Sequence, residues 1–219
     1  MQKSWSAVDN YLINQLLPND PLLEKVLENN QQAGLPAIDV AANQGQLLAL
    51  FVRMTRAKRV LEIGTLGGYS TIWMGRELPE GGKLTTLEFD AHHAEVARQN
   101  LQLAGLENKV EVIEGPALDS LATLDPSETF DLIFIDADKP NNPYYLQWAL
   151  LYSHPGTLIV GDNVVREGEV TRPESQDKSV QGVRRFIEMM GNDPRLTCTA
   201  LQTVGLKGWD GFTLAWVNG

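Results

Sequence analysis

Two apolar runs of the chain stop abruptly on side chains that carry oxygen. The first lies in the segment FDLIFIDADK (Phe130 to Lys139) and the second in GTLIVGDN (Gly156 to Asn163). Short uninterrupted apolar runs are typical of strands buried on both faces of a parallel sheet, and ligands of such sheets bind beyond the carboxyl ends of the strands. The sequence therefore predicts an α/β fold in which Asp136, Asp162 and Asn163 meet as two halves of one metal site.

The chain divides into an amino-terminal helical part and a part that alternates strands with helices. The apolar spacing of the first part predicts helices at Ser4 to Leu17, Pro21 to Gln32 and Gln44 to Met54. The alternation predicts strands at Val60 to Ile63, Lys83 to Phe89, Val110 to Ile113, Asp131 to Ile135 and Thr157 to Val160. We expect a single domain of residues 1–219, with residues 1–55 as a helical cap and residues 56–219 as the ligand-binding α/β sheet.

The carboxyl-terminal part carries the signature of a hairpin. After a predicted helix from Ser179 to Met190, the runs Leu196 to Gln202 and Gly211 to Val217 are rich in Thr, Leu, Phe and Trp. The glycines between them, together with Trp209 and Asp210, predict the turn. A hairpin makes one end of an otherwise parallel, doubly wound sheet antiparallel.

Composition excludes several classes of partner. The chain of 219 residues has 28 Asp and Glu against 18 Lys and Arg, a formal charge of −10. This charge repels phosphate backbones and anionic lipid, so we expect no nucleic acid and no membrane partner. The longest apolar run, Leu47 to Val52, is too short to cross a bilayer, and the single cysteine, Cys198, cannot form an intramolecular disulfide. We expect a cytoplasmic protein.

The first predicted strand runs into a glycine-rich turn, VLEIGTLGGYS (Val60 to Ser70), which differs from the GxGxxG dinucleotide pattern. Glu88 closes the next strand, where a carboxylate can accept hydrogen bonds from the ribose hydroxyls of an adenosine cofactor. Glu62 adds a carboxylate near the turn, which would repel a pyrophosphate and attract an ammonium group. These charges favour S-adenosylmethionine over NAD, although a nicotinamide-dependent oxidoreductase remains open.

Four motifs together resemble the cation-dependent O-methyltransferases of the catechol and caffeoyl-CoA type. They are VLEIGTLGGYS, EGPAL (Glu114 to Leu118), DADK (Asp136 to Lys139) and GDN (Gly161 to Asn163), and they occur in the family's order. The resemblance implies a Rossmann-like, doubly wound, seven-stranded sheet with its last strand antiparallel, and a homodimer. It also implies a set of residues that bind S-adenosylmethionine: Val40, Glu62, Gly64, Thr65, Ser70, Glu88, Ala117, Asp136 and Asp138.

The same resemblance gives roles to the acidic strand ends. Asp136, Asp162 and Asn163 offer only oxygen ligands, which suit Mg²⁺, with Ca²⁺ or Mn²⁺ as alternatives, rather than zinc. Such an ion leaves room for both oxygens of a catechol-like acceptor. Lys139 matches the lysine to which the family assigns general-base catalysis, and Asp136 is grouped with it as catalytic. Pairing of Lys139 with Asp136 or Asp138 for structural reasons alone is the competing interpretation.

Other chemically capable residues carry weaker expectations. His92, His93 and His154 lack the spacing of a metal set and are expected on the surface. Trp209 suits either an aromatic substrate or a neighbouring chain, and Arg166 suits an acidic group of a substrate. The spacing of Tyr144, Tyr145 and Trp148 predicts core packing, and the polar segment Glu167 to Ser179 predicts a mobile loop over the site.

The function that these observations favour is an S-adenosylmethionine-dependent, divalent-metal-dependent O-methyltransferase that acts on a catechol-like small molecule. A non-catalytic cofactor-binding module is the third interpretation. A non-catalytic module does not need a set of candidate metal ligands and a candidate base. The presence of such a set argues against this interpretation: Asp136, Lys139, Asp162 and Asn163.

Overall fold

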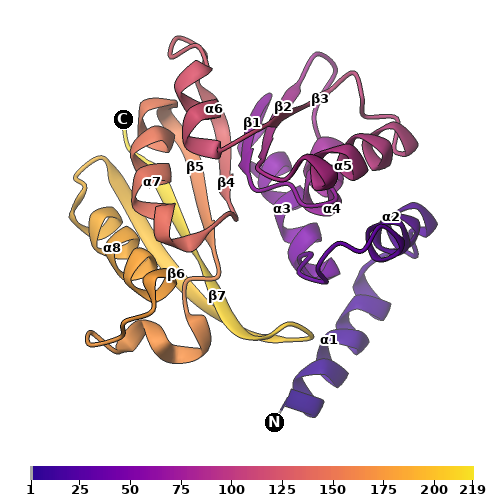
Figure 1. Cartoon of the computed structure of the whole chain (residues 1–219), viewed down its shortest axis with the longest axis horizontal. Helices are drawn as coiled ribbons and strands as arrows, with labels where there is room; N and C mark the ends of the chain where they lie inside the picture. The colour runs from indigo at the N-terminus through magenta and orange to yellow at the C-terminus, as the bar shows by residue number, and fades with distance from the viewer. Residues whose placement is uncertain (1) are drawn as a thin grey trace.

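A computed structural model describes residues 2–219, which fold around one seven-stranded sheet (Figure 1). The strand order is β3-β2-β1-β4-β5-β7-β6. Strands β1 (Arg59–Ile63), β2 (Lys83–Glu88), β3 (Val110–Glu114), β4 (Phe130–Ile135) and β5 (Ser153–Asp162) pair in parallel. The last strand, β7 (Gly208–Val217), pairs antiparallel with both β5 and the edge strand β6 (Leu196–Gly205). The predicted fold class is confirmed.

The hairpin turn lies earlier than the sequence predicts. Gly205 pairs with Gly208, so only Leu206 and Lys207 connect β6 to β7. Two-residue connections are the commonest hairpin loops, because their backbone twist matches that of the strands. Trp209 and Asp210, which the sequence pattern assigned to the turn, are therefore the second and third residues of β7.

Alternation of side chains along the strands produces two apolar layers. In β4, Leu132 and Phe134 pack on one face with α3 (Ala42–Thr55), α4 (Tyr69–Gly75) and α5 (Ala91–Leu103). Ile133 and Ile135 pack on the other face, where the covering helices are α6 (Ala117–Thr123), α7 (Asn142–Leu151) and α8 (Lys178–Asn192). All four side chains are fully buried, as the uninterrupted apolar run predicts.

The amino-terminal helices are tied to the sheet by polar contacts. Helix α2 (Pro21–Gln32) begins where the carboxylate of Asp20 accepts hydrogen bonds from two backbone amides. Helix α1 (Gln2–Leu16) lies beside the tip of the β6–β7 hairpin in Figure 1. There the buried carboxylate of Asp9 accepts hydrogen bonds from the Leu206 amide at 2.8 Å and from the Asn43 side chain at 3.2 Å. Among residues 2–219, no helix combines the length and apolarity that crossing a membrane requires.

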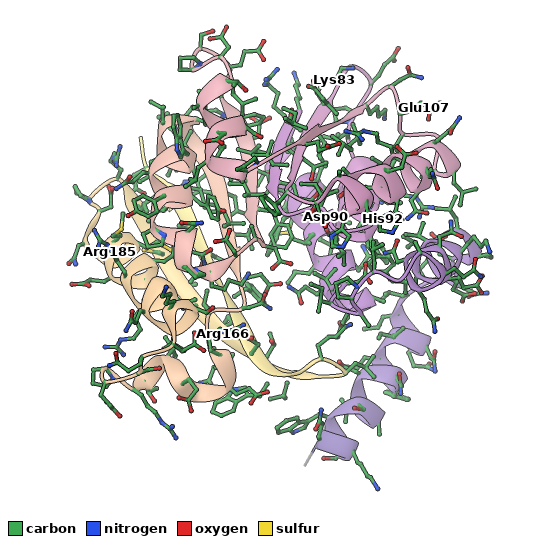
Figure 2. All side chains as sticks on the ribbon, in the orientation of Figure 1. Lys83, Asp90, His92, Glu107, Arg166 and Arg185 are labelled. Atoms are coloured by element: carbon green, nitrogen blue, oxygen red, sulfur yellow. The ribbon has the colours of Figure 1, made fainter. Side chains whose placement is uncertain are left out.

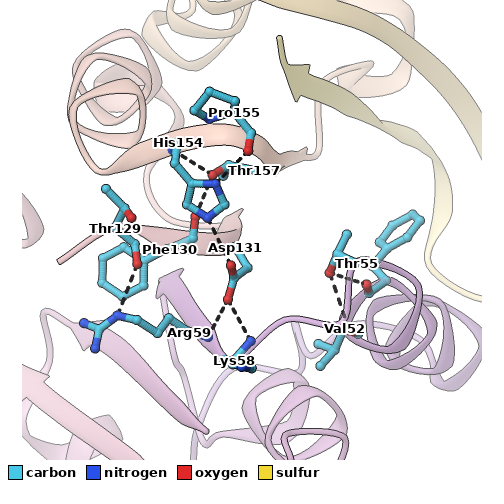
Figure 3. Close-up of polar contacts among 11 residues, drawn as sticks. Val52, Thr55, Lys58, Arg59, Thr129, Phe130, Asp131, His154, Pro155 and Thr157 are labelled. Atoms are coloured by element: carbon cyan, nitrogen blue, oxygen red, sulfur yellow. Dashed lines mark hydrogen bonds and ion pairs between the residues drawn. The ribbon is translucent and has the colours of Figure 1, made fainter. Parts of the chain in front are cut away.

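A polar cluster fastens the strands near the amino-terminal ends of β1 and β4 (Figure 3). The Asp131 carboxylate accepts hydrogen bonds from the backbone amides of Lys58 and Arg59 at 2.7 and 2.8 Å and lies 3.0 Å from Nε2 of His154. These donors lower the pKa of Asp131, although partial burial opposes them. His154 was expected on the surface; its half-buried ring instead links the start of β5 to β4.

Candidate active site

A cavity of about 1040 Å³ opens at the carboxyl ends of β1, β2, β4 and β5. Strand order reverses between β1 and β4, and such switch points are where open α/β sheets bind ligands. Ligand pockets usually have volumes between about 300 and 1,000 Å³, so this cavity lies at the upper end of the usual size. A second hollow of about 760 Å³ lies between α7 and α8 and contains none of the motif residues.

The cavity brings together every predicted site residue except Glu62. Its walls include Val40, Gly64, Thr65, Ser70, Glu88, Ala117, Asp136, Asp138, Lys139, Asp162 and Asn163. Residues from the helical cap, four strand ends and two helix starts therefore converge on one space, although they are far apart in sequence.

The glycine-rich turn approaches the end of β4 too closely for a side chain. Gly64 has φ +101°, and a Cβ there would lie 2.3 Å from the Asp136 carbonyl oxygen. Oε2 of Glu88 accepts hydrogen bonds from the amides of Thr65 and Leu66 at 3.1 and 2.8 Å. Glu88, which the sequence assigned to ribose binding, thus also fixes the turn while remaining on the cavity wall.

Glu62 does not line the cavity. Its side chain is fully buried and accepts hydrogen bonds from the hydroxyls of Ser70 at 2.6 Å, Thr86 at 2.7 Å and Thr71. Burial raises the pKa of Glu62 to about 7, although the three hydroxyls oppose that rise. Strand alternation directs Glu62 under α4, where its hydroxyl partners Ser70 and Thr71 lie, so its place in the cofactor site stays a prediction.

Two carboxylates lie at the neighbouring ends of β4 and β5. Asp136 follows Ile135, which pairs with Gly161, the residue before Asp162. Burial raises the pKa of Asp162 to about 7, and the charge of Asp136 adds to this rise. Nε2 of Gln44, from α3, donates a hydrogen bond to Asp162 Oδ2 at 2.6 Å. The charge of Lys139 acts in the opposite direction and lowers the pKa of Asp162.

The ligand chemistry around this pair fits a hard divalent cation. Asp136, Asp162 and Asn163 line the same cavity and offer two carboxylates and one amide oxygen, the donors that Mg²⁺, Mn²⁺ and Ca²⁺ accept. Within residues 2–219, His, Cys, Asp and Glu side chains nowhere gather in threes as a metal site. The Asn163 amide lies on the same cavity wall as the two aspartates.

Lys139 lies within the same group of charges. Its side chain is almost fully buried, and Nζ is 2.9 Å from Asp136 Oδ1. Lys139 opens the short segment η1 (Lys139–Asn141), against which α8 packs so closely that a Cβ on Gly182 would meet the Lys139 carbonyl oxygen at 2.2 Å. The backbone that carries the amine is therefore rigidly packed.

Asp138 faces the cavity in a fixed orientation. The hydroxyl of Tyr145 donates to one of its carboxylate oxygens, and Nδ2 of Asn141 donates to the other at 2.7 Å. Burial raises the pKa of Tyr145, and the neighbouring Asp138 carboxylate raises it further. Tyr145 is buried as its helical spacing predicts, but it is also one of the residues that line the cavity, a role that spacing could not reveal.

Comparisons with known proteins agree with this geometry. A sequence model of the family described as O-methyltransferase matches residues 15–216. The chain belongs to this O-methyltransferase family. A catechol O-methyltransferase of Mycobacterium tuberculosis is 51% identical over 211 residues, covering 96% of this chain and 95% of that protein. The match confirms the enzyme class that the sequence predicts, an S-adenosylmethionine-dependent O-methyltransferase. It does not support the alternative of a nicotinamide-dependent oxidoreductase.

Solved structures of similar proteins support the same family. A candidate O-methyltransferase from Klebsiella pneumoniae is 74% identical with a TM-score of 0.99, and each chain covers 100% of the other. The O-methyltransferase from Bacillus cereus, solved in complex with SAH, is 54% identical with a TM-score of 0.98 over 100% of both chains. The fold of this O-methyltransferase is thus shared along its whole described length.

Several residues that line the cavity of this O-methyltransferase were not predicted from the sequence. Gln44 and Asp39 come from the cap, and His93 and Phe89 come from the segment around the start of α5. None stands in a motif, because their positions depend on how separate elements pack. His93 was expected on the surface, but its Nδ1 is 3.5 Å from Glu88 Oε1.

The segment after β5 contains secondary structure that its polar composition does not predict. It contains the short helical segment η2 (Arg166–Thr171). Trp209 packs over it, since a Cβ on Gly168 would lie 2.8 Å from the Trp209 ring. Trp209 also donates a hydrogen bond to Gln202 at 3.0 Å, so its contacts are with its own chain rather than with the cavity.

Proposed function

We propose that this O-methyltransferase transfers a methyl group from S-adenosylmethionine to one hydroxyl of a vicinal dihydroxy aromatic molecule and requires a divalent cation. The observation that carries the proposal is the convergence of Asp136, Asp162 and Lys139 on the cavity that contains the glycine-rich turn. Relatives from Mycobacterium tuberculosis and Niastella koreensis, 51% and 47% identical, are catechol O-methyltransferases, which supports the same acceptor class.

The cofactor is assigned to the part of the cavity around the turn. When bound, S-adenosylmethionine supplies a methyl group activated by its positively charged sulfur. Glu88 and Asp138 would bind its ribose hydroxyls and its ammonium group, because both carboxylates line the cavity and are held by donors from the chain. The remaining wall is assigned to Val40, Gly64, Thr65, Ser70, Ala117 and Asp136. Glu62 acts indirectly, through its hydrogen bond to Ser70.

The acceptor and the cation are assigned to the ends of β4 and β5. Asp136, Asp162 and Asn163 would hold Mg²⁺, with Mn²⁺ and Ca²⁺ as alternatives. When bound, such an ion lowers the pKa of an adjacent hydroxyl and orients a chelating diol. Gln44 keeps the buried Asp162 carboxylate in place through its 2.6 Å hydrogen bond.

Lys139 is assigned as the general base. Its Nζ lies 2.9 Å from Asp136 Oδ1, where the protonated amine donates a hydrogen bond, and after losing its own proton the neutral amine would accept the proton of the acceptor hydroxyl. The resulting oxygen anion attacks the methyl carbon while the bond from that carbon to sulfur breaks, so no covalent intermediate with the enzyme forms. The enzyme's remaining task is to align the acceptor with the methyl group, and such positioning can contribute about 7–11 kcal/mol.

The assembly and location of the enzyme remain proposals as well. We propose a cytoplasmic homodimer built from single methyltransferase domains, each with residues 1–55 as its cap. Support comes from exposed apolar side chains on α1 and the β6–β7 hairpin, including Tyr11, Leu16, Leu201 and Trp216. Light scattering coupled to size-exclusion chromatography would test the dimer directly.

The proposed chemistry is tested by product formation. Purified enzyme mixed with S-adenosylmethionine, Mg²⁺ and caffeic acid should yield a monomethylated product by mass spectrometry, and EDTA should abolish it. Asp162→Ala should remove the Mg²⁺-dependent activity, whereas Asp125→Ala, in an exposed turn, should retain it. Undiminished turnover by Asp162→Ala in EDTA would overturn the metal requirement.

A further inference from the structure

We propose that Arg166 binds an anionic substituent of the acceptor, so that the preferred substrates are vicinal diols carrying a carboxylate. This inference rests on the proposed function and names the substrate class of the same site. Arg166 lines the cavity together with Asp162, Asn163 and Lys139, and it follows Asp162 by four residues. Figure 2 places it on the η2 side of the molecule, away from Asp90 and His92 at the start of α5.

The guanidinium group of Arg166 has donors to spare. Within residues 2–219, Nε is one of the few buried side-chain polar atoms that have no hydrogen-bond partner. The guanidinium group of arginine presents a rigid set of donors that matches the two oxygens of a carboxylate. A buried donor without a hydrogen-bond partner costs free energy. Nε itself is enclosed by the protein, and the side chain as a whole is 33% exposed, so a ligand carboxylate in the cavity would meet the exposed part of the guanidinium group.

The nearest anion of the chain, Asp210, does not fill that role. Oδ1 of Asp210 accepts hydrogen bonds from the backbone amides of Val165 and Arg166 at 2.9 and 3.1 Å. Its Oδ2 lies 4.0 Å from Nη1 of Arg166, which is too long for a hydrogen bond. Asp210 thus holds the backbone of Arg166 and forms a long ion pair with its guanidinium group, without accepting a hydrogen bond from it.

The backbone around Arg166 is held in an unusual conformation. Arg166 and Glu167 both have φ +54°, a left-handed conformation that non-glycine residues rarely adopt. Gly168 continues the turn with φ +85° beneath the ring of Trp209. The backbone that carries Arg166 is therefore held by residues of β7 before any ligand binds, and a preorganised backbone loses less entropy on binding.

The charge of the cavity makes this position selective. Its walls carry six carboxylates, from Asp39, Glu88, Asp119, Asp136, Asp138 and Asp162. Of its cationic side chains, Lys139 is paired with Asp136, and Lys207 donates to the Ala37 carbonyl oxygen at 3.2 Å. An anionic substituent would be repelled over most of this wall and attracted beside Arg166. Charge thus favours one orientation of a carboxylated diol.

The test compares two acceptors that differ in charge but closely match in shape, caffeate and its primary amide. Wild-type enzyme with Mg²⁺ should favour caffeate in kcat/KM. Arg166→Gln should lower kcat/KM for caffeate about 10- to 100-fold, mainly through KM, as expected for a lost charge-assisted hydrogen bond, and change it less than about 3-fold for the amide. For caffeate, the kcat/KM of Arg166→Lys should lie between those of wild type and Arg166→Gln, because lysine keeps the positive charge but loses the paired donors of the guanidinium group.

Arg172→Gln is the matched control. Arg172 directly follows η2, pairs with Glu169 and does not line the cavity, so its loss should leave both acceptors unaffected. If Arg166→Gln lowered kcat/KM equally for caffeate and its amide, the inference would be overturned. Arg166 would then only offset the negative charge of the cavity aspartates. No change for either acceptor would overturn the inference too.

A binding measurement separates this inference from the proposed function. Calorimetric titration of the SAH-loaded enzyme with each acceptor in Mg²⁺ should show tighter binding of caffeate, and Arg166→Gln should remove the difference. If that preference holds while neither acceptor is methylated, the proposed function fails and the inference stands. If methylation occurs and caffeate has no binding advantage, the inference fails alone.

Discussion

The buried carboxylate of Glu62 should make the stability of the enzyme depend on pH, and Glu62→Gln should remove that dependence. Burial raises the pKa of Glu62 from its ordinary 4.5 to about 7 in the folded protein. The folded state therefore holds a proton that the unfolded state releases between these two pH values. Because the folded state binds more protons there, the free energy of unfolding falls as pH rises through this range.

The size of the effect follows from the same two pKa values. At about 1.4 kcal/mol per pKa unit, the rise from 4.5 to about 7 corresponds to about 3 kcal/mol. Glutamine is neutral at every pH but replaces one acceptor oxygen by a donor, which disturbs the hydroxyls of Ser70, Thr71 and Thr86. We expect Glu62→Gln to be less stable than wild type at pH 5 by about 1 kcal/mol. Above pH 7.5 it should equal or exceed wild type.

Urea denaturation of both proteins at pH 5, 6, 7 and 8 measures this difference. Asp162, whose pKa is also raised to about 7, is present in both proteins, so its contribution largely cancels. Glu111→Gln, an exposed glutamate of β3, is the control and should show no pH-dependent difference from wild type. A Glu62→Gln difference that stays constant within about 0.5 kcal/mol from pH 5 to pH 8 would refute the reasoning, because the shift predicts a change of about 2.5 kcal/mol over this range.

Three further substitutions test other parts of the site and the fold. Lys139→Met should lower kcat/KM at least about 100-fold while leaving the Kd for SAH unchanged, and comparable activity would contradict its role as base. Tyr145→Phe removes a donor to Asp138 and should raise the Kd for SAH by roughly 3- to 10-fold in calorimetry; an unchanged Kd would separate Asp138 from the cofactor. Asp131→Ala should lower the free energy of unfolding by about 2–3 kcal/mol without changing kcat, and a loss below about 0.5 kcal/mol would mean that the contact with His154 and its neighbours adds little.

The fold was predictable because its signals are local. An apolar run such as that of β4 must be buried on both faces, and the oxygen-bearing residues after it can only lie at the strand end. The approach of Asp136 to Asp162 follows from the pairing of two parallel strands, which the motifs of the family imply. The nucleus of the candidate site could therefore be placed without coordinates.

The remaining features depend on contacts between distant segments. The side to which Glu62 points is set by the pleat of β1, and its partners lie on α4 and β2. Gln44 reaches Asp162 across 118 positions of sequence, and the orientation of Arg166 depends on Asp210, which lies 44 positions further along the chain. No pattern within a single element records such contacts.

The most direct test of the account is the position of the metal ion. Crystals of the enzyme with SAH, Mn²⁺ and caffeate should be measured at the manganese absorption edge. We predict one strong anomalous peak in the cavity, contacted by side-chain oxygens of Asp136, Asp162 and Asn163, with the diol of caffeate beside it and near Lys139. A cavity without an anomalous peak, or a peak that touches neither aspartate, would contradict the proposed metal-dependent methyl transfer.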